Sequence, residues 1–194
     1  GPPAAGQAPP VVRGGAAAAA LSSAADCGSP VRGVAADSSG ANGMDVRGAK
    51  IIGLGSYVPE RVMTNFDLEK MVDTTDEWIF SHTGMRERHI AAPEQATSDL
   101  ALEAGKAALA DAGLAPEDLD LVIVATVTPD MFFPSVSSLV QGALGATRAG
   151  AFDILIGCTG FVYALSTASA FVQAGMAEHV LVIAAETLSR IVNW

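Results

Sequence analysis

The chain has few of the residues that mark several large classes of protein. Its 194 residues include two cysteines, Cys27 and Cys158, too few for a disulfide framework, which favours a reducing compartment. Charged residues make up only 16% of the sequence and aromatic residues 6%. No apolar run approaches the ~18 residues that a membrane-spanning helix requires, so we expect no membrane association.

Positive charge is scarce as well. The formal net charge is −10, and it falls on the part of the chain after residue 50, because residues 1–50 hold four basic and three acidic residues. An acidic body repels nucleic acid and anionic lipid. The one compact basic group, at 86–89, is too small to reverse this, so we predict no nucleic-acid partner.

Large apolar residues are almost absent from residues 1–49, which carry proline pairs, an alanine run at 16–20 and scattered Ser and Gly. No helix or strand period persists there, and this predicts a disordered, low-complexity extension. Its Ala and Ser content, with Arg and few acids, is also typical of a transit segment. We therefore expect a plastid or similar organelle if 1–49 is such a segment, and otherwise the cytoplasm.

From Lys50 onward the pattern is that of an α/β protein. Apolar runs without alternation predict buried strands at 51–55, 119–125, 152–156 and 180–185. Capping residues and amphipathic spacing predict helices at 66–72, 75–84, 99–112, 134–144 and 159–174. Such strands indicate a mixed sheet covered by helices on both faces. The end at Trp194, soon after a strand, suggests that 50–194 is a truncated half-domain.

The helix expected at 159–174 has no charged residue. A helix without a polar face is normally buried on all sides. In a chain of this size, its cover requires a second half-domain or a second subunit.

Cys158 lies where a buried strand ends at Gly157 and this helix begins. The helix dipole and the unpaired N–H groups of the first turn favour a thiolate at such a position. A thiolate is the nucleophile that attacks thioesters, so Cys158 is the candidate catalytic residue. Nothing in the sequence predicts a metal site.

Four segments together resemble β-ketoacyl-acyl carrier protein synthase III, the condensing enzyme that starts type II fatty acid synthesis. They are Ile51-Ile-Gly-Leu-Gly-Ser-Tyr-Val-Pro59, Thr75-Asp-Glu-Trp-Ile79, Thr83-Gly-Met-Arg-Glu-Arg-His-Ile90 and Gly157-Cys-Thr-Gly-Phe-Val-Tyr-Ala164. The resemblance runs from about Lys50 to Trp194. It implies the thiolase-like fold, of which this chain matches the first, N-terminal half.

The resemblance also implies a reaction. Cys158 takes an acetyl group from acetyl-CoA, which is a substrate and not a cofactor. Malonyl-acyl carrier protein then loses CO₂ and attacks the acyl-cysteine, which gives acetoacetyl-acyl carrier protein. The family's histidine and asparagine belong to the second half, so we expect the fragment alone to be inactive in condensation. A homodimer is implied too.

By the same resemblance, Trp78 stacks on the adenine of coenzyme A and Thr74 makes a polar contact nearby. His82 stands where many members carry an arginine that packs on the nucleotide. Phe133 matches a phenylalanine that limits acyl chain length in the neighbouring subunit, although Phe132 lies one position away.

Two other functions stay open at this point. One is a related thiolase-fold condensing enzyme with a different acyl primer. The other is a non-catalytic, half-length protein that dimerises or binds coenzyme A. A dinucleotide-binding loop at Gly53 and Gly55 is disfavoured, because position 58 is valine and Pro59 interrupts the helix that would bind phosphate.

Overall fold

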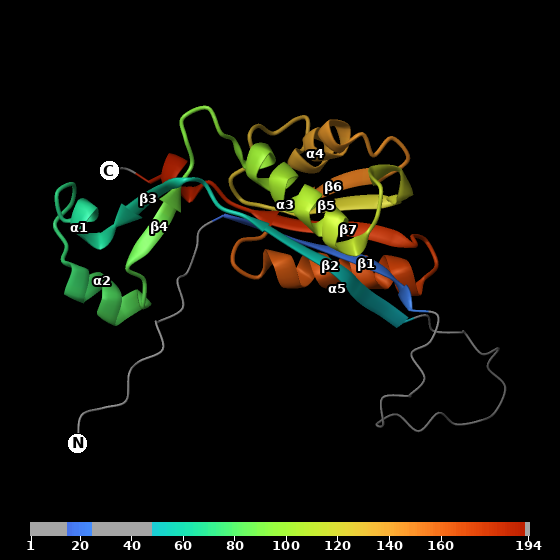
Figure 1. Ribbon diagram of the computed structural model, residues 1–194, viewed down its shortest axis with the longest axis horizontal. Helices are drawn as coiled ribbons and strands as arrows, with labels where there is room; N and C mark the ends of the chain where they lie inside the picture. Colours follow the sequence, from blue (N-terminus) through green and yellow to red (C-terminus); the bar gives the residue numbers. More distant parts are fainter. Residues whose placement is uncertain (1–14, 25–47, 193–194) are drawn as a thin grey trace, which may run out of the picture.

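The computed structural model describes residues 15–24 and 48–192 (Figure 1). Its strands are β1 (Ala16–Ala24), β2 (Gly48–Tyr57), β3 (Arg61–Thr64), β4 (Glu87–Ile90), β5 (Leu121–Ala125), β6 (Gly150–Ile154) and β7 (His179–Ala185). Its α-helices are α1 (Asn65–Leu68), α2 (Asp76–Thr83), α3 (Thr97–Ala112), α4 (Val136–Leu144) and α5 (Gly160–Gln173). Short 3-10 turns lie at Pro116–Asp118 and Leu188–Arg190.

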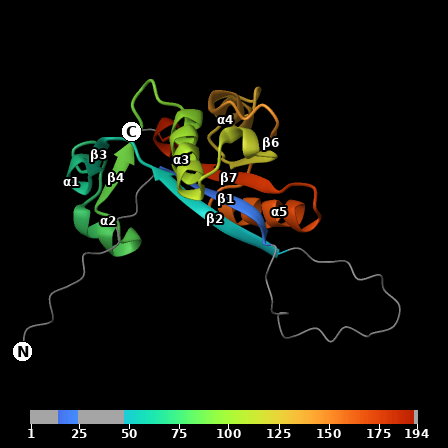
Figure 2. The same cartoon turned by 45° about the vertical axis from the view of Figure 1, so that its right-hand side comes forward.

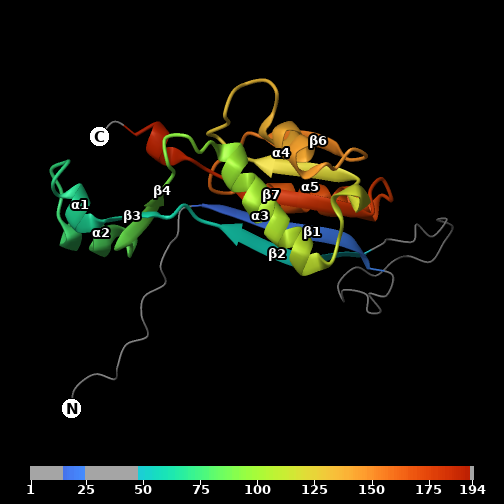
Figure 3. The same ribbon diagram turned by 45° about the horizontal axis from the view of Figure 1, so that its top comes forward.

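One five-stranded sheet organises most of these elements, in the order β2-β1-β7-β5-β6. Strands β5, β6 and β7 run parallel, whereas β1 runs antiparallel to both β2 and β7. Helices α3 and α4 cover one face of the sheet and α5 covers the other (Figures 1 and 3). This arrangement confirms the predicted mixed sheet with helices on both faces.

A smaller unit lies beside one end of the sheet (Figure 2). In it β3 and β4 pair antiparallel, next to α1 and α2, around a small core of Met63, Leu68 and Ile79. The sequence did not predict these strands, because each is only four residues long and neither alternates clearly. Helix α2 ends as expected at Gly84, which takes a positive φ of 70°.

Strand β1 corrects the expectation of a structureless extension at 1–49. It lies between β2 and β7, with Ala18 opposite Gly55 on one side and Ile183 on the other. Alanine has a low strand propensity, and for this reason the pattern gave no strand signal. The described domain therefore includes part of the segment before Lys50. Residues 1–14 and 25–47, and with them most of the predicted transit segment, lie outside the described residues.

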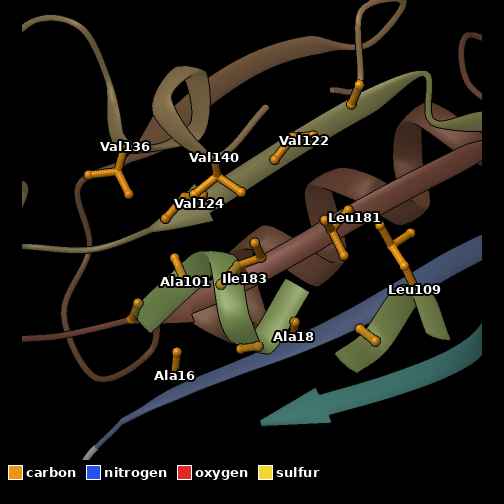
Figure 4. Close-up of a cluster of buried hydrophobic side chains, with 14 of the residues drawn as sticks. Ala16, Ala18, Ala101, Leu109, Val122, Val124, Val136, Val140, Leu181 and Ile183 are labelled. Carbon is orange, nitrogen blue, oxygen red and sulfur yellow. The ribbon is translucent and has the colours of Figure 1, made fainter. Parts of the chain in front are cut away.

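Two apolar clusters fill the spaces on either side of the sheet. The cluster beneath α3 and α4 contains side chains from β1, β5 and β7 (Figure 4); among those labelled are Ala16, Ala18, Val122, Val124, Leu181 and Ile183. The cluster beneath α5 takes the alternate residues of the same strands, such as Ala19, Ile123 and Val182. The continuous apolar runs of the sequence are thus explained by burial on both faces.

Gly53 and Gly55 allow α3 to approach β2 closely. A Cβ added to Gly55 would overlap the backbone of Ala104 and Ala108, and one added to Gly53 would meet Ala108 O at 2.5 Å. The two glycines therefore serve helix packing, which agrees with the rejection of a dinucleotide loop from the sequence.

Among the described residues, helix α5 is buried on one side only, against the sheet, and the cover expected for its other side from a second half-domain or subunit stays a prediction. Gly160, Ala164, Ala168 and Val172 face the sheet and are buried. Val162 and Tyr163 on its other side are 63% and 56% exposed. The residues that the structure describes supply no second layer over that side.

Replacing Gly55 with alanine should destabilise the fold by about 1–3 kcal/mol, the usual cost of overpacking, because the rigid backbone of α3 blocks the new methyl group. Gly142→Ala on α4 is the matched control, since nothing lies within 4 Å of its Cβ. That substitution should leave stability unchanged or raise it by up to about 1 kcal/mol. Urea unfolding of both variants measures the difference. Equal midpoints would contradict the close packing.

Candidate functional site

Cys158 lies in the short loop between β6 and α5, as the sequence predicted. The strand ends at Ile154, two residues earlier than expected, and α5 begins at Gly160. Gly160 is buried, and a Cβ on it would meet the Ala125 Cβ at 3.0 Å. This close approach sets the first turn of α5 directly on the end of β5, with Cys158 just before it.

The N-terminus of α5 has no side-chain cap. Thr159 occupies the cap position, but its hydroxyl does not accept a hydrogen bond from the first turn. Helix α4 differs, because Ser135 caps it and the Asp153 carboxylate accepts the Val136 and Ser137 N–H groups at 2.8 Å each. The α5 terminus therefore keeps its partial positive charge directed towards the Cys158 loop.

Cys158 is an exposed, free thiol in a cavity of about 770 Å³. This is within the usual size range of small-molecule sites. The cavity lies where β2, β5 and β7 end and β1 begins, and its walls include Tyr57, Val127, Phe161 and Leu188. A second cavity of about 620 Å³, lined in part by Pro59, His89 and Leu100, also reaches Cys158.

Glu186, directly after β7, lines both cavities. Its carboxylate accepts hydrogen bonds from the Val127 N–H (2.9 Å), the Thr126 hydroxyl (3.3 Å) and the Thr128 hydroxyl. It thus ties the loop after β5 to the end of β7.

The network extends to α3. The Thr128 hydroxyl accepts from the Thr187 N–H at 2.9 Å, and the Thr97 hydroxyl donates to the Thr128 carbonyl at 2.5 Å. Thr97 and Thr187 are both buried. Sequence reasoning missed these threonines, because short hydroxyl side chains scattered along a chain give no local signal of a shared site.

The predicted nucleotide-binding residues lie on or just before α2, in the smaller unit (Figure 2), and none of them lines either cavity that reaches Cys158. Trp78 and His82 stack on α2 with ring centroids 4.4 Å apart, and the Trp78 side chain is 58% exposed. His82 Nδ1 lies 2.8 Å from the Trp78 carbonyl, which can only accept, so Nδ1 donates this bond. Thr74 is half-buried just before α2.

The basic residues of this unit mostly have structural partners. The Arg86 guanidinium lies 3.3 Å from Asp76 and 3.9 Å above the Phe80 ring. Arg88 donates to the Met63 carbonyl, and burial lowers the pKa of its guanidinium. Both are therefore engaged within the fold.

Phe132 and Phe133 are 99% and 88% exposed, in the loop between β5 and α4. Neither lines the Cys158 cavity of its own chain. The expected role of Phe133, which places it against a second subunit, stays a prediction.

Metal ligands do not gather in the described part of the chain, where no three His, Cys, Asp or Glu side chains could hold an ion together. None of the helices at 15–24 and 48–192 is long and apolar enough to cross a membrane.

Glu186→Ala should destabilise the protein by about 1–3 kcal/mol, because it leaves an N–H and two hydroxyl donors beside the cavity without their acceptor. Glu103→Ala on α3 is the control, since Glu103 is exposed and bonds only to Lys106 among the described residues. Thermal unfolding of both variants measures the cost. A loss in Glu186→Ala no larger than in Glu103→Ala would contradict the network.

Comparison with known proteins gives consistent results. The family 3-oxoacyl-[acyl-carrier-protein (ACP)] synthase III matches residues 152–194. A curated β-ketoacyl-[acyl-carrier-protein] synthase III of Caldanaerobacter subterraneus subsp. tengcongensis is 65% identical over 146 residues, which cover 75% of this chain and 44% of that protein. The corresponding protein of Desulfitobacterium hafniense (strain DSM 10664 / DCB-2) is 58% identical over 144 residues, covering 74% of this chain and 44% of its own.

Solved structures agree with these matches. The 3-oxoacyl-[acyl-carrier-protein] synthase III of Aquifex aeolicus VF5 superposes with a TM-score of 0.73 at 54% identity, covering 75% of this chain and 47% of its own. The priming β-ketosynthase of the R1128 polyketide pathway gives 0.72 at 38% identity, covering 74% and 43%. The thiolase-like α/β fold expected from the sequence is therefore confirmed. The chain belongs to the β-ketoacyl-[acyl-carrier-protein] synthase III family, and it spans about 44% of the length of these curated relatives.

Proposed function

We propose that this chain carries the acyl-accepting half of a condensing enzyme that starts fatty acid synthesis. The observation that carries the proposal is the position of Cys158, a free thiol exposed in a cavity before an uncapped helix N-terminus. A curated relative that is 65% identical bears the name of the condensing enzyme. A thiol in such a place is suited to hold an acyl group covalently while a second substrate enters.

The first step is acyl transfer from acetyl-CoA. The Cys158 sulfur attacks the thioester carbonyl, and a new carbon–sulfur bond forms as the bond to coenzyme A breaks. Coenzyme A leaves as its thiol with the proton that Cys158 gave up. The Cys158 N–H donates to no group of the described residues, so it is free to bind the oxygen as negative charge develops there.

Trp78 is the proposed platform for the adenine ring of coenzyme A. The stacked His82 covers part of one indole face, while 58% of the Trp78 side chain stays exposed. Thr74, immediately before α2, is placed to make a polar contact with the same nucleotide. The imidazole of His82 offers less fixed charge to a phosphate than an arginine would.

The second step is the condensation itself, with malonyl-acyl carrier protein as the second substrate. Loss of CO₂ yields a carbanion that attacks the carbonyl carbon of acyl-Cys158. A carbon–carbon bond forms as the carbon–sulfur bond breaks, Cys158 leaves as its thiolate, and the product is acetoacetyl-acyl carrier protein. No described residue is assigned to help this decarboxylation, so we expect the chain as given to acylate without completing condensation. A homodimer, with Phe133 of one subunit near the acyl site of the other, belongs to the same proposal.

A different acyl primer is the second candidate function. The observation that favours it is the structural match to the priming β-ketosynthase of the R1128 polyketide pathway, at 38% identity. The same cysteine chemistry would serve there with another acyl-CoA. An organelle location stays a prediction, and the relatives named above, which are bacterial, give it no support.

Incubation with radiolabelled acetyl-CoA should leave label on the Cys158 peptide, and Cys158→Ser should reduce this label at least 100-fold, because a hydroxyl is a far weaker nucleophile. Peptide mapping separates Cys158 from Cys27. Cys27→Ser is the matched control and should keep the label. Equal labelling of the parent chain and Cys158→Ser would overturn the proposed nucleophile, and preference for another acyl-CoA would favour the second candidate.

Trp78→Ala should weaken binding of coenzyme A about tenfold, since stacking of a base on an aromatic ring contributes about 1–3 kcal/mol. Calorimetric titration measures the affinity. Phe66→Ala, which removes another aromatic ring, 60% exposed, from the same unit, is the control and should bind as the parent chain does. Unchanged affinity in Trp78→Ala would rule out the adenine platform.

A further inference from the structure

The start of β1 reaches the cavity that holds Cys158. Gly15, Ala16 and Ala17 all contribute to its lining. A Cβ on Gly15 would overlap the Tyr57 carbonyl and lie 2.8 Å from the Val58 side chain, so glycine lets the chain enter β1 tightly against the end of β2. The segment dismissed from the sequence as low complexity therefore forms part of the candidate active site.

A row of small side chains crosses the sheet at this point. Ala17 pairs with Ser56 of β2 on one side and with Ala184 of β7 on the other, and Ala184 pairs with Ala125 of β5. All four residues line the cavity of Cys158. Ala184 and Ala125 belong to the apolar cluster beneath α5, so the row forms a floor on the α5 side of the sheet.

Packing inside the fold requires a small side chain at one member of the row but not at another. Ala125 is 3% exposed and lies under Gly160, where the first turn of α5 leaves no room for a larger side chain. Ala17 is exposed, although its neighbours Ala16 and Ala18 are buried against α3. Packing within the described residues therefore explains the size of Ala125 but not that of Ala17, whose methyl group borders open cavity.

We propose that β1 forms a wall of the acyl-binding cavity and that Ala17 sets the size of the acyl group that Cys158 accepts. This rests on the proposed function, because it takes the acyl chain delivered in the transfer step as the occupant. Small side chains, three of them alanine, that share a cavity with a free thiol fit a short alkyl chain, which carries no group that needs a hydrogen-bond partner. Ala17 is thus a specificity-determining residue from a segment that sequence reasoning had left out of the domain.

The test is a size competition at Cys158 in the full chain. Equimolar acetyl-CoA and hexanoyl-CoA compete for the parent chain, for Ala17→Leu and for the milder Ala17→Val, and peptide mass spectrometry measures both adducts. The hexanoyl-to-acetyl ratio should fall about tenfold in Ala17→Leu and less in Ala17→Val, since each carbon added to the wall removes space from the longer chain. Ala110→Leu, at an exposed position of α3 outside the cavity, should keep the parent ratio.

A second reagent pair separates this proposal from the proposed function. Methyl and hexyl methanethiosulfonate transfer an alkylthio group to a thiol and release sulfinate, and neither needs a coenzyme A site. If the parent chain takes no acyl group from either acyl-CoA, the proposed function fails, and a fall in the hexyl-to-methyl ratio in Ala17→Leu still supports the wall.

An unchanged size ratio in Ala17→Leu, with the cysteine still modified, would overturn the proposal. Loss of the cooperative thermal transition in both Ala17 variants would also overturn it, because it would show that Ala17 is packed within the fold and does not face a cavity.

Discussion

The pairing of β1 with both β2 and β7 is the constraint on which the rest of the structure depends. Without β1, the edge strand β2 would have no backbone partner in the sheet, and the β7 edge would be open. Residues 18–20 of β1 are at most 2% exposed, and their side chains contribute to the apolar clusters on both faces of the sheet. Satisfied backbone hydrogen bonds and removal of apolar surface from water thus coincide in one alanine-rich strand.

Close contact between helices and the sheet then places the candidate site. Gly53 and Gly55 bring α3 onto β2, and Gly160 brings α5 onto Ala125. The first turn of α5 thus lies against the end of β5, and the loop before it places Cys158 at the same ends of the parallel strands. Two hydrogen bonds stabilise the same ends of the strands. Glu186, after β7, accepts from the Val127 N–H in the loop after β5, and Asp153 of β6 accepts from the Val136 N–H of α4. The geometry around the thiol is therefore a result of packing on both faces.

The hydrophobic pattern and the capping residues predicted most of the elements from Lys50 onward, because buried strands and helix ends are marked by residues that are adjacent in the sequence. Cys158 was found for the same reason, since strand, glycine, cysteine and helix follow each other in the chain. Strands β3 and β4 were missed because four residues give no period. Burial of the outer face of α5 stays a prediction, because the described residues cover only the side that packs on the sheet.

The sequence by itself determined the α/β class, the candidate nucleophile and the family, because these depend on residues that are close together or on motifs that recur in order. Only the tertiary structure showed that Ala16–Ala24 is a central strand and that Ala17, Ser56, Ala184 and Ala125 meet beneath one cavity. Alanine has little conformational preference that could mark such a strand. Its role is set by neighbours on β2, β5 and β7 that lie far from it in the sequence, which no local pattern records.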